Sequence, residues 1–310
     1  MTTILLCSLT HDLSRLQSIL QRIAPEFDVR VWPAPDLDPD NVSVAVCWYP
    51  PSGVLGGFPR LQMISSLAAG VDSILSDPEL PDVPVCRVID PNLAPGMAEY
   101  VGWATLLYHR GFDEAAASRR RREWRTPEQR AAAQTRVGVM GLGVLGLAVA
   151  TFLRGLGFDV SGWSRTRKQA DGMATFAGLD ELPAFLADRD IVVCLLPLTP
   201  LTRGILGEST FALMKRGAAL INCGRGEHLV ASDLIAALDA GQLRGAVLDV
   251  FPVEPLAVDS PLWGDPRVVV TPHMASAARL EVIAEQVVAN ARKVFAGAQP
   301  INTVDRVRGY

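Results

Sequence analysis

The sequence VGVMGLGVLG, residues 137–146, predicts a buried strand, a tight glycine turn and the start of a helix. Its last six residues fit G-x-G-x-x-G, a pattern typical of dinucleotide-binding units when it joins a strand to a helix. In that pattern Gly141 makes the turn, Gly143 lets the backbone approach a pyrophosphate, and Gly146 lets the helix pack closely on the sheet. The predicted phosphate loop is Gly141, Leu142, Gly143, Val144, Leu145 and Gly146. The alternative is that the glycines serve packing alone.

Short apolar runs and helical patterns alternate on both sides of this loop. The predicted strands are 3–8, 28–32, 44–48, 62–66, 83–88, 135–140, 158–163, 191–195, 218–223, 245–250 and 267–270. The predicted helices are 12–23, 97–122, 144–156, 182–187, 231–240 and 275–295. This alternation is typical of parallel sheets covered by helices. The later series of strands predicts a doubly wound nucleotide-binding sheet, so the fold class is α/β.

Length and charge limit the architecture and the partners. A chain of 310 residues suggests two domains. Hydrophobic residues make up 49% and charged residues 20%, which excludes a wholly disordered or fibrous chain. The net charge of −4 gives no overall field for binding nucleic acid or an anionic membrane, so we expect neither as a partner.

Cysteine content and the N-terminal sequence bear on location. The five cysteines are odd in number and include no C-x-x-C pair, so we expect no disulfide framework and no metal site. The N-terminal residues lack the basic and apolar regions of a signal peptide. Residues 137–153 form an uncharged stretch of 17 residues, but its glycines belong to the predicted turn and not to a membrane helix. We therefore expect a cytoplasmic protein.

The end of the second strand after the glycine loop predicts which cofactor is used. An acidic residue at this place binds the ribose hydroxyls of NAD, but the strand here ends in WSRTRK, residues 163–168, without a carboxylate. A hydroxyl followed by cationic groups suits the additional phosphate of NADP. We therefore predict NADP, with NADPH preferred over NADH, bound through Ser164, Arg165, Thr166 and Lys168. The alternative is a solvated basic turn.

Polar side chains follow three later strands, where an open α/β sheet binds its ligands. Arg225 follows one strand, Asp249 and Glu254 follow the next, and His273 follows the last. A guanidinium can hold the carboxylate of a 2-oxo acid and polarise its carbonyl, while an imidazolium can protonate the carbonyl oxygen as hydride arrives. A carboxylate can orient that imidazole. We predict that Arg225, Glu254 and His273 are catalytic, although each alone fits an ordinary loop or turn position.

These motifs resemble the D-isomer-specific 2-hydroxyacid dehydrogenase family and, within it, the glyoxylate and hydroxypyruvate reductases. The segments that carry the resemblance are Gly141–Gly146, Trp163–Lys168, Asn222–Gly226, Leu248–Pro255, Thr271–His273, Trp48–Pro51, Ala68–Asp72 and Val304–Tyr310. The resemblance implies the catalytic set already named. It also implies further cofactor contacts at Leu196, Pro197, Cys223 and Asp249, the last two beside the nicotinamide amide. The substrate-binding residues that it implies are Trp48, Ala69, Gly70, Arg225, His273 and Arg279.

The resemblance also implies an architecture. It predicts a Rossmann cofactor domain, residues 97–285, inserted into a flavodoxin-like substrate domain, residues 1–96 and 286–310. The stretch 90–96 looks like a hinge between them. A homodimer through the cofactor domain is expected.

The activity implied is the NADPH-dependent reduction of glyoxylate, hydroxypyruvate and related 2-oxo acids to D-2-hydroxy acids. Three departures from the family pattern surround the substrate: Tyr49 in place of His, Ala68 in place of Gly, and Met274–Ser276 in place of a smaller aliphatic run. They extend the expected substrates to larger 2-oxo acids such as phenylpyruvate. The alternatives are a dinucleotide-sensing corepressor of the same fold and, less favoured, a methyltransferase.

Other polar residues fit structural roles better. His228, three residues after Arg225, is a rival acid without a carboxylate partner in a recognisable motif, and His11 and His109 suit packing or surface positions. The run Arg119–Arg122 is interpreted as a solvated helix end, because cations suit a helix C-terminus. Cys223 lacks a base of its own, so we do not expect it to be a nucleophile.

Overall fold

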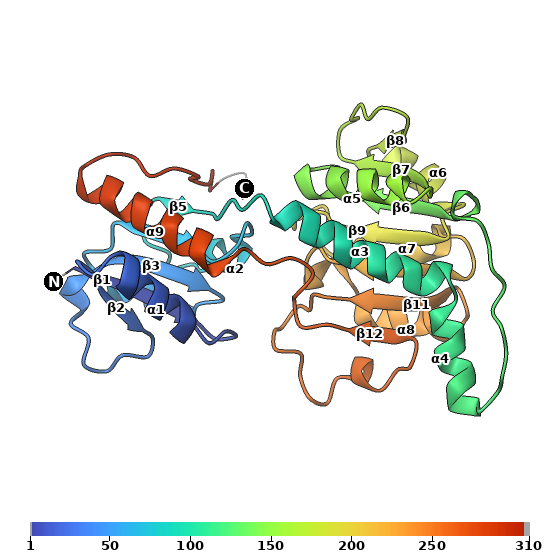
Figure 1. The fold of residues 1–310 in the computed structure, drawn as a ribbon, viewed down its shortest axis with the longest axis horizontal. Helices are drawn as coiled ribbons and strands as arrows, with labels where there is room; N and C mark the ends of the chain where they lie inside the picture. Colours follow the sequence, from blue (N-terminus) through green and yellow to red (C-terminus); the bar gives the residue numbers. More distant parts are fainter. Residues whose placement is uncertain (1, 307–310) are drawn as a thin grey trace. The chain divides into compact units, whose positions relative to one another are not determined.

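The computed structural model describes residues 2–306, which form two compact α/β units (Figure 1). One unit contains the described residues up to Asn92 together with those from Ala277 onward, and the other is Leu93–Ser276. Each unit is built on one sheet whose strands are all parallel. The predicted α/β class is therefore confirmed.

The first unit has a five-stranded sheet in the order β2-β1-β3-β4-β5, which is the flavodoxin-like order. Its strands are β1 Thr3–Ser8, β2 Asp28–Val31, β3 Val42–Trp48, β4 Met63–Ser66 and β5 Val85–Cys86. Its helices are α1 Ser14–Ile23, α2 Asp72–Leu75 and α9 Leu280–Phe295, with short 3₁₀ helices at η1 Pro39–Asn41 and η2 Val54–Gly57.

Both faces of this sheet are covered, as the alternation along β1 shows. Ile4 and Leu6 face the core beneath α1 and α9, while Leu5 and Cys7 face the core on the opposite side. A strand points successive side chains to opposite faces, so a central strand that is apolar at every position requires two covered faces. Helix α9 lies beside α1 in Figure 1, which brings the C-terminal part of the chain onto the N-terminal sheet.

The second unit has a seven-stranded sheet in the order β12-β11-β10-β9-β6-β7-β8. Its strands are β6 Arg136–Met140, β7 Asp159–Ser164, β8 Ala174–Ala177, β9 Ile191–Cys194, β10 Ala218–Asn222, β11 Leu243–Leu248 and β12 Val268–Val270. Its helices are α3 Leu93–His109, α4 Phe112–Arg121, α5 Val144–Gly155, α6 Leu182–Leu186, α7 Glu208–Leu213 and α8 Ala231–Asp239. Short 3₁₀ helices occur at η3 Ala132–Gln134, η4 Leu179–Glu181, η5 Gly226–His228 and η6 Pro261–Trp263.

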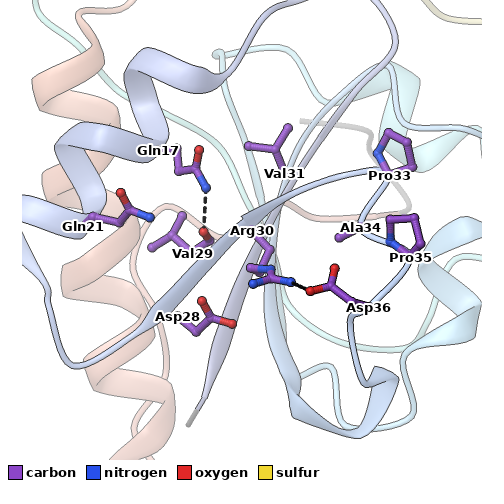
Figure 2. A pocket seen from close by; sticks show the side chains of 10 residues that line it. All are labelled: Gln17, Gln21, Asp28, Val29, Arg30, Val31, Pro33, Ala34, Pro35 and Asp36. Atoms are coloured by element: carbon purple, nitrogen blue, oxygen red, sulfur yellow. Dashed lines mark hydrogen bonds and ion pairs between the residues drawn. The ribbon is translucent and has the colours of Figure 1, made fainter.

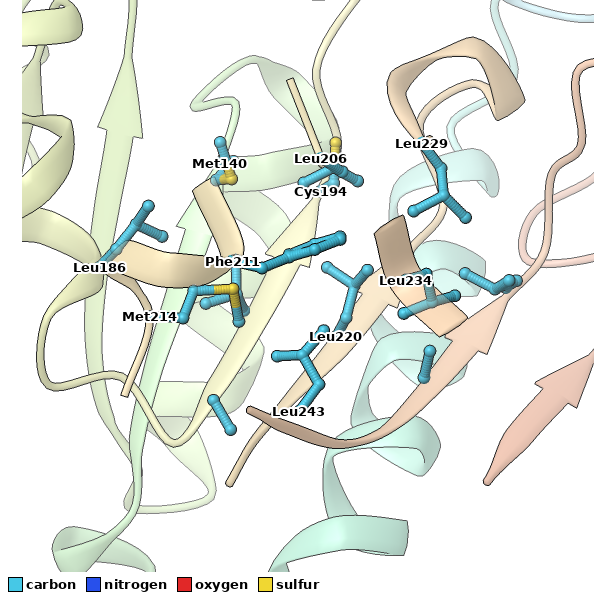
Figure 3. Close-up of a cluster of buried hydrophobic side chains, with 14 of the residues drawn as sticks. Met140, Leu186, Cys194, Leu206, Phe211, Met214, Leu220, Leu229, Leu234 and Leu243 are labelled. Atoms are coloured by element: carbon cyan, nitrogen blue, oxygen red, sulfur yellow. The ribbon is translucent and has the colours of Figure 1, made fainter. Parts of the chain in front are cut away.

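Two apolar cores sandwich this second sheet. Figure 3 shows the core formed with α6, α7 and α8, in which Phe211 lies among side chains such as Leu220 and Leu234. The core on the opposite face contains residues of α3 and α5. Gly102 allows these two helices to approach, because a Cβ there would lie 2.5 Å from the Phe152 ring. Helix α3 therefore belongs to the second unit.

The predicted long helix 97–122 is wrong in two respects. It is divided into α3 and α4 at Gly111, which has a φ of +67° and takes the left-handed conformation that ends a helix. Helix α3 also begins at Leu93, so the last part of the predicted hinge is helical. Pro95 is tolerated there because the first backbone amides of a helix have no partner within it.

The last predicted helix, 275–295, begins later, at Leu280. The amides of Met274 and Ala275 instead donate to the carboxylate of Asp249, at 2.9 Å each, and this holds their segment as a loop. Strand β8 and helix α7 were not predicted. Strand β8 is only half-buried and lacks the continuous apolar run that marks the other strands.

The units meet in the sequence at 92/93 and 276/277, whereas the predicted domain boundaries were 96/97 and 285/286. The second predicted boundary falls within α9. One face of that helix, including Ile283 and Val287, is buried in the core of the first unit, so the helix is not divided between units. The segment Val304–Tyr310, which carries part of the family resemblance, is described only as far as Arg306. Val307, Arg308, Gly309 and Tyr310 lie outside the described residues.

Among residues 2–306, no helix is both long and apolar enough to cross a membrane.

The C-terminal tail is tied to the first unit by one buried side-chain amide. Asn290, 2% exposed, accepts a bond from the Ile301 amide at 2.8 Å and donates to the Ile301 carbonyl at 3.0 Å. Two residues further on, Thr303 bridges to Cys86 of β5.

We expect Asn290→Ala to lower the free energy of unfolding by about 1–3 kcal/mol, because it leaves two backbone groups without their partner. Urea unfolding followed by circular dichroism measures this. Glu285→Ala, an exposed position on the same helix, is the control and should change the free energy by less than about 0.5 kcal/mol. Equal effects of the two substitutions would contradict the assignment.

Candidate active site

Five strands of the second sheet, β6 and β9 to β12, end at one row of paired residues that crosses the sheet. Met140 pairs with Cys194, Cys194 with Asn222, Asn222 with Leu248, and Leu248 with Val270. Because the strands are parallel, the loops that follow these residues leave from the same edge of the sheet. The strand order reverses between β6 and β9, which makes this edge a topological switch point of the kind where ligands bind.

The glycine loop joins β6 to α5 as predicted. Gly141 has a φ of +105°, and a Cβ there would lie 2.6 Å from the Leu195 carbonyl oxygen. A Cβ on Gly146 would lie 1.7 Å from the Gly141 carbonyl oxygen, whereas one on Gly143 would meet no atom within 4 Å. The first and third glycines are therefore required by packing, while Gly143 leaves open space at the start of α5. A pyrophosphate fits this cradle.

The other loop positions follow from this geometry. The Leu142 side chain is 3% exposed and packs where a Cβ on Gly162 would stand, so only its backbone can face a ligand. Val144 is 81% exposed, and Leu145 is half-buried. The loop after β9 contains Leu196, which is buried, and Pro197, whose carbonyl accepts a bond from the Thr202 hydroxyl at 2.8 Å.

The basic segment after β7 divides into structural and exposed residues. Ser164 is buried, and its hydroxyl donates to the Thr166 carbonyl at 2.8 Å. Arg167 donates to the Thr175 carbonyl at 2.7 Å and pairs with Glu181, so this cation is used to attach β8. Arg165, Thr166 and Lys168 are exposed. Arg167 is exposed too, but its side chain is attached to β8 by these bonds.

The loop after β10 holds Arg225 by both of its backbone polar groups. The Arg225 amide donates to Nδ1 of His228 at 3.0 Å, and the Arg225 carbonyl accepts from the Asn222 side chain at 3.2 Å. Its guanidinium donates to the Gly224 carbonyl at 2.7 Å. A Cβ on Gly226 would lie 1.8 Å from the Phe251 carbonyl carbon, so the glycine after Arg225 admits the neighbouring loop.

The structure brings His273 and Glu254 together. Nδ1 of His273 lies 2.8 Å from Oε2 of Glu254, and Oε1 of Glu254 accepts from the Phe251 amide at 3.0 Å. The side chains are 18% and 9% exposed, so the pair is shielded but reachable. The contact at Nδ1 orients the ring, so that Nε2 is the nitrogen on the side away from the carboxylate.

Asp249 holds the loop that carries His273. Its carboxylate is 1% exposed and accepts from the Thr271 hydroxyl at 2.6 Å, as well as from the Met274 and Ala275 amides. Burial raises the pKa of Asp249, although these hydrogen bonds act in the opposite direction. The His273 amide donates to the Asp249 carbonyl at 2.9 Å, which supports the left-handed φ of +53° at His273. Binding of the nicotinamide amide by Asp249 and the Cys223 backbone stays a prediction.

The residues expected to bind substrate from the first unit lie on three separate segments. Trp48 is buried at the end of β3 with its ring edge-on to Tyr49. Ala69 and Gly70 belong to a turn shaped by the Ser66 hydroxyl, which donates to the Gly70 carbonyl at 2.7 Å. Among residues 2–306, the Ala69 and Gly70 amides donate no hydrogen bond.

Arg279 precedes α9, and its amide donates to the buried carboxylate of Asp90 at 2.9 Å. The guanidinium of Arg279 pairs with the same carboxylate at 3.4 Å while its side chain stays 60% exposed. Arg279 is therefore anchored to the first unit but accessible to a ligand.

Several residues that shape the site were not singled out from the sequence. The Tyr100 hydroxyl contacts the Thr271 hydroxyl, extending the Asp249 network to α3. Asn222, which ends β10, bonds both Arg225 and the Gly224 amide. Asn222 begins a segment that carries the family resemblance, and as a single residue its signal is a polar side chain at the end of an apolar strand. Tyr100 gives none, because its contact joins residues that are far apart in the chain.

The residues that we did not expect to take part in catalysis lie in surroundings that suit structural roles. His109 hydrogen-bonds Thr135 at 2.9 Å and stacks edge-on to Phe158. His11 lies edge-on to Trp48. The arginine run occupies the last turn of α4 and its C-cap, all exposed. Burial raises the pKa of the Cys223 thiol, which does not suit a nucleophile.

A hollow of about 370 Å³ lies in the first unit, between α1 and the segment after β2, and Figure 2 shows the side chains that line it. None of the predicted site residues lines it. Three of its polar side chains are held within it, since Gln17 donates to the Val29 carbonyl at 2.8 Å and Arg30 pairs with Asp36. This hollow therefore adds nothing to the site at the strand ends.

Comparison with known proteins gives consistent results. Residues 103–275 match the family model described as D-isomer specific 2-hydroxyacid dehydrogenase, NAD binding domain. The chain is 41% identical over 304 residues to glyoxylate/hydroxypyruvate reductase A of Yersinia enterocolitica, covering 96% of this chain and 95% of that protein.

Two solved structures are similar over the whole chain. A D-isomer specific 2-hydroxyacid dehydrogenase from Xanthobacter autotrophicus Py2, in complex with NADPH and MES, has a TM-score of 0.87 and 44% identity, covering 100% of this chain and 99% of that one. An NADPH-dependent glyoxylate/hydroxypyruvate reductase from Sinorhizobium meliloti, in complex with NADP and sulfate, has a TM-score of 0.89 and 35% identity, covering 100% of both chains. The resemblance identified in the sequence is confirmed, and the chain belongs to the D-isomer specific 2-hydroxyacid dehydrogenase family.

Proposed function

We propose that this enzyme uses NADPH to reduce small 2-oxo acids, including glyoxylate and hydroxypyruvate, to D-2-hydroxy acids. The observation that carries the proposal is the His273–Glu254 pair at 2.8 Å, on the sheet edge that also bears the glycine loop. The relatives named as glyoxylate/hydroxypyruvate reductases support the substrate class. Phenylpyruvate is included as a larger candidate because Tyr49 and Met274 alter the expected surroundings of the substrate.

The residues of this chain supply acid catalysis and charge stabilisation. NADPH, when bound, supplies the hydride. His273 delivers a proton from Nε2 to the carbonyl oxygen of the substrate, and Glu254 orients the imidazole through Nδ1. Arg225 holds the substrate carboxylate and polarises the carbonyl. In the first unit we assign the Ala69 and Gly70 amides, Trp48 and Arg279 to substrate binding.

The preference for NADPH rests on the end of β7. The segment Trp163–Lys168 contains no carboxylate of the kind that binds the ribose of NAD, while the exposed Arg165 and Lys168 side chains provide positive charge. The crystallised relatives that contain NADPH or NADP support this preference. We also propose a cytoplasmic location, which the five unpaired, buried cysteine thiols support.

We propose in addition that the enzyme forms a homodimer through the cofactor-binding unit. That unit exposes large apolar side chains on α3, on α4 and on the segment after them: Trp103, Leu106, Phe112 and Trp124, with Trp124 at 103%. Exposed apolar side chains of this size are typical of an interaction surface.

The central test is the absorbance of NADPH during reaction with glyoxylate, hydroxypyruvate and phenylpyruvate. We expect turnover with at least one of them, and His273→Ala should lower kcat by a factor of about 10² or more because the proton donor is lost. The Kd for NADPH should change little. His109→Ala serves as the control, since His109 packs against Phe158 and should not affect kcat. Tight NADPH binding without turnover of any 2-oxo acid would support the dinucleotide-sensing alternative instead.

The cofactor assignment is tested with two neighbouring arginines. Arg165→Ala should weaken NADPH binding about tenfold, the scale of one charge-assisted hydrogen bond, and weaken NADH much less. Arg167→Ala is the matched control because Arg167 is already paired with Glu181, and it should leave the NADPH-to-NADH ratio unchanged. An equal loss for both cofactors in Arg165→Ala would show that Arg165 does not contact the 2′-phosphate.

The dimer is tested by sedimentation of the purified enzyme. We expect the mass of two 33.3 kDa chains, and Trp124→Asp should shift the equilibrium toward one chain because a charge is costly in an apolar interface. Val258→Asp, at a position 96% exposed in the same unit, should leave the dimer intact. A wild-type enzyme with the mass of one chain would refute the proposal.

A further inference from the structure

His228 is fully buried, at 0% exposure, three residues after Arg225, and the proposed chemistry does not use it. Its Nδ1 accepts a hydrogen bond from the Arg225 backbone amide at 3.0 Å. Its Nε2 lies 3.3 Å from the Pro197 carbonyl oxygen. The Sγ atom of Cys194 is 3.8 Å from Nδ1. One imidazole thus contacts the loop after β9 and the loop after β10.

These partners fix the protonation of the ring. A backbone amide only donates and a carbonyl only accepts, so Nδ1 must be without a proton and Nε2 must carry one. His228 is therefore neutral, with the proton on Nε2 directed at Pro197. Both nitrogens are engaged by the backbone, and neither is placed to serve a substrate. His228 is consequently not a second general acid.

The ring connects two loops that also bond each other. The Gly204 amide donates to the Glu227 carbonyl at 2.9 Å, and the Leu206 amide donates to the His228 carbonyl at 2.8 Å. The imidazole lies where a side chain on Gly224 would stand, since a Cβ there would be 2.8 Å from Nδ1. Burial in this notch gives the ring one position, and that position determines where the Arg225 amide points.

Resting on the function proposed above, we propose that His228 is a positioning residue for Arg225. The hydrogen bond from the Arg225 amide to Nδ1 fixes the backbone position from which the guanidinium extends. The contact between Nε2 and the Pro197 carbonyl holds that backbone in place relative to the loop after β9. The Asn222 side chain holds the Arg225 carbonyl from the other side. An arginine that must present a planar pair of donors to a carboxylate is sensitive to small changes in this backbone.

Two amide substitutions separate the two bonds of His228. His228→Asn places an oxygen near the position of Nδ1 and can still accept from Arg225, whereas His228→Gln places its amide near Nε2 and retains only the Pro197 contact. We expect kcat/KM for the 2-oxo acid to fall about tenfold to a hundredfold in His228→Gln, the scale of one unsatisfied buried donor, and to stay within about threefold in His228→Asn. The Kd for NADPH should be unchanged in His228→Gln.

A double-mutant cycle separates positioning from general destabilisation. In an Arg225→Ala background, His228→Gln should cause little further loss of kcat/KM, because its effect acts through Arg225. His109→Gln, which alters the histidine bonded to Thr135 at the opposite end of β6, should leave kcat/KM unchanged. Equal losses in His228→Asn and His228→Gln, or additive losses in the cycle, would overturn the proposal.

One measurement is independent of turnover. The ¹⁵N chemical shifts of the His228 imidazole in the wild-type enzyme should show the neutral tautomer protonated at Nε2, and a ring protonated at Nδ1 would overturn the positioning role. A wild-type enzyme that carries this tautomer but reduces no 2-oxo acid would instead contradict the proposed function.

Discussion

The ladder of backbone hydrogen bonds across the second sheet is the constraint on which the site depends. It places Met140, Cys194, Asn222, Leu248 and Val270 in one row, so five loops begin at the same edge. No single loop then needs to be long to bring the glycine turn to the same edge as the proposed catalytic residues. The apolar side chains on both faces of the sheet hold the ladder in register, because a shift by one residue would move each strand's buried side chains to the wrong face.

A buried carboxylate converts this register into the orientation of the proposed proton donor, His273. Asp249 immediately follows Leu248, and its burial is tolerated because the Thr271 hydroxyl and two amides of the next loop satisfy it. The same bonds draw residues 271–275 over the strand end and support the left-handed backbone at His273. The imidazole therefore faces Glu254 without a helix or strand of its own to position it.

The sequence was sufficient for features whose signals are local. The glycine spacing predicted the turn at Gly141, and polar residues after apolar strands predicted Glu254 and His273, which the structure brings together. The place of Arg225 beside them stays a prediction. It was insufficient where a residue's role depends on a distant partner. Arg167 belonged to the same basic run as Arg165, yet it pairs with Glu181, and the break at Gly111 was hidden within a helical pattern. His228 and Tyr100 likewise acquire their roles only through contacts made after folding.

The two histidines beside this edge show how surroundings assign different tasks to one side chain. The side chain of His273 is 18% exposed, and a carboxylate lies 2.8 Å from one of its nitrogens, which is the arrangement that we propose for a proton donor. His228 is fully buried, with the Arg225 amide donating to Nδ1 and the Pro197 carbonyl oxygen near Nε2. A second proton on the ring would sit on Nδ1 and face the N–H group of that amide. The first arrangement favours proton exchange and the second opposes it. The polarity of the hydrogen-bond partners, more than the position in the sequence, therefore separates the proposed acid from the residue that we propose to position Arg225.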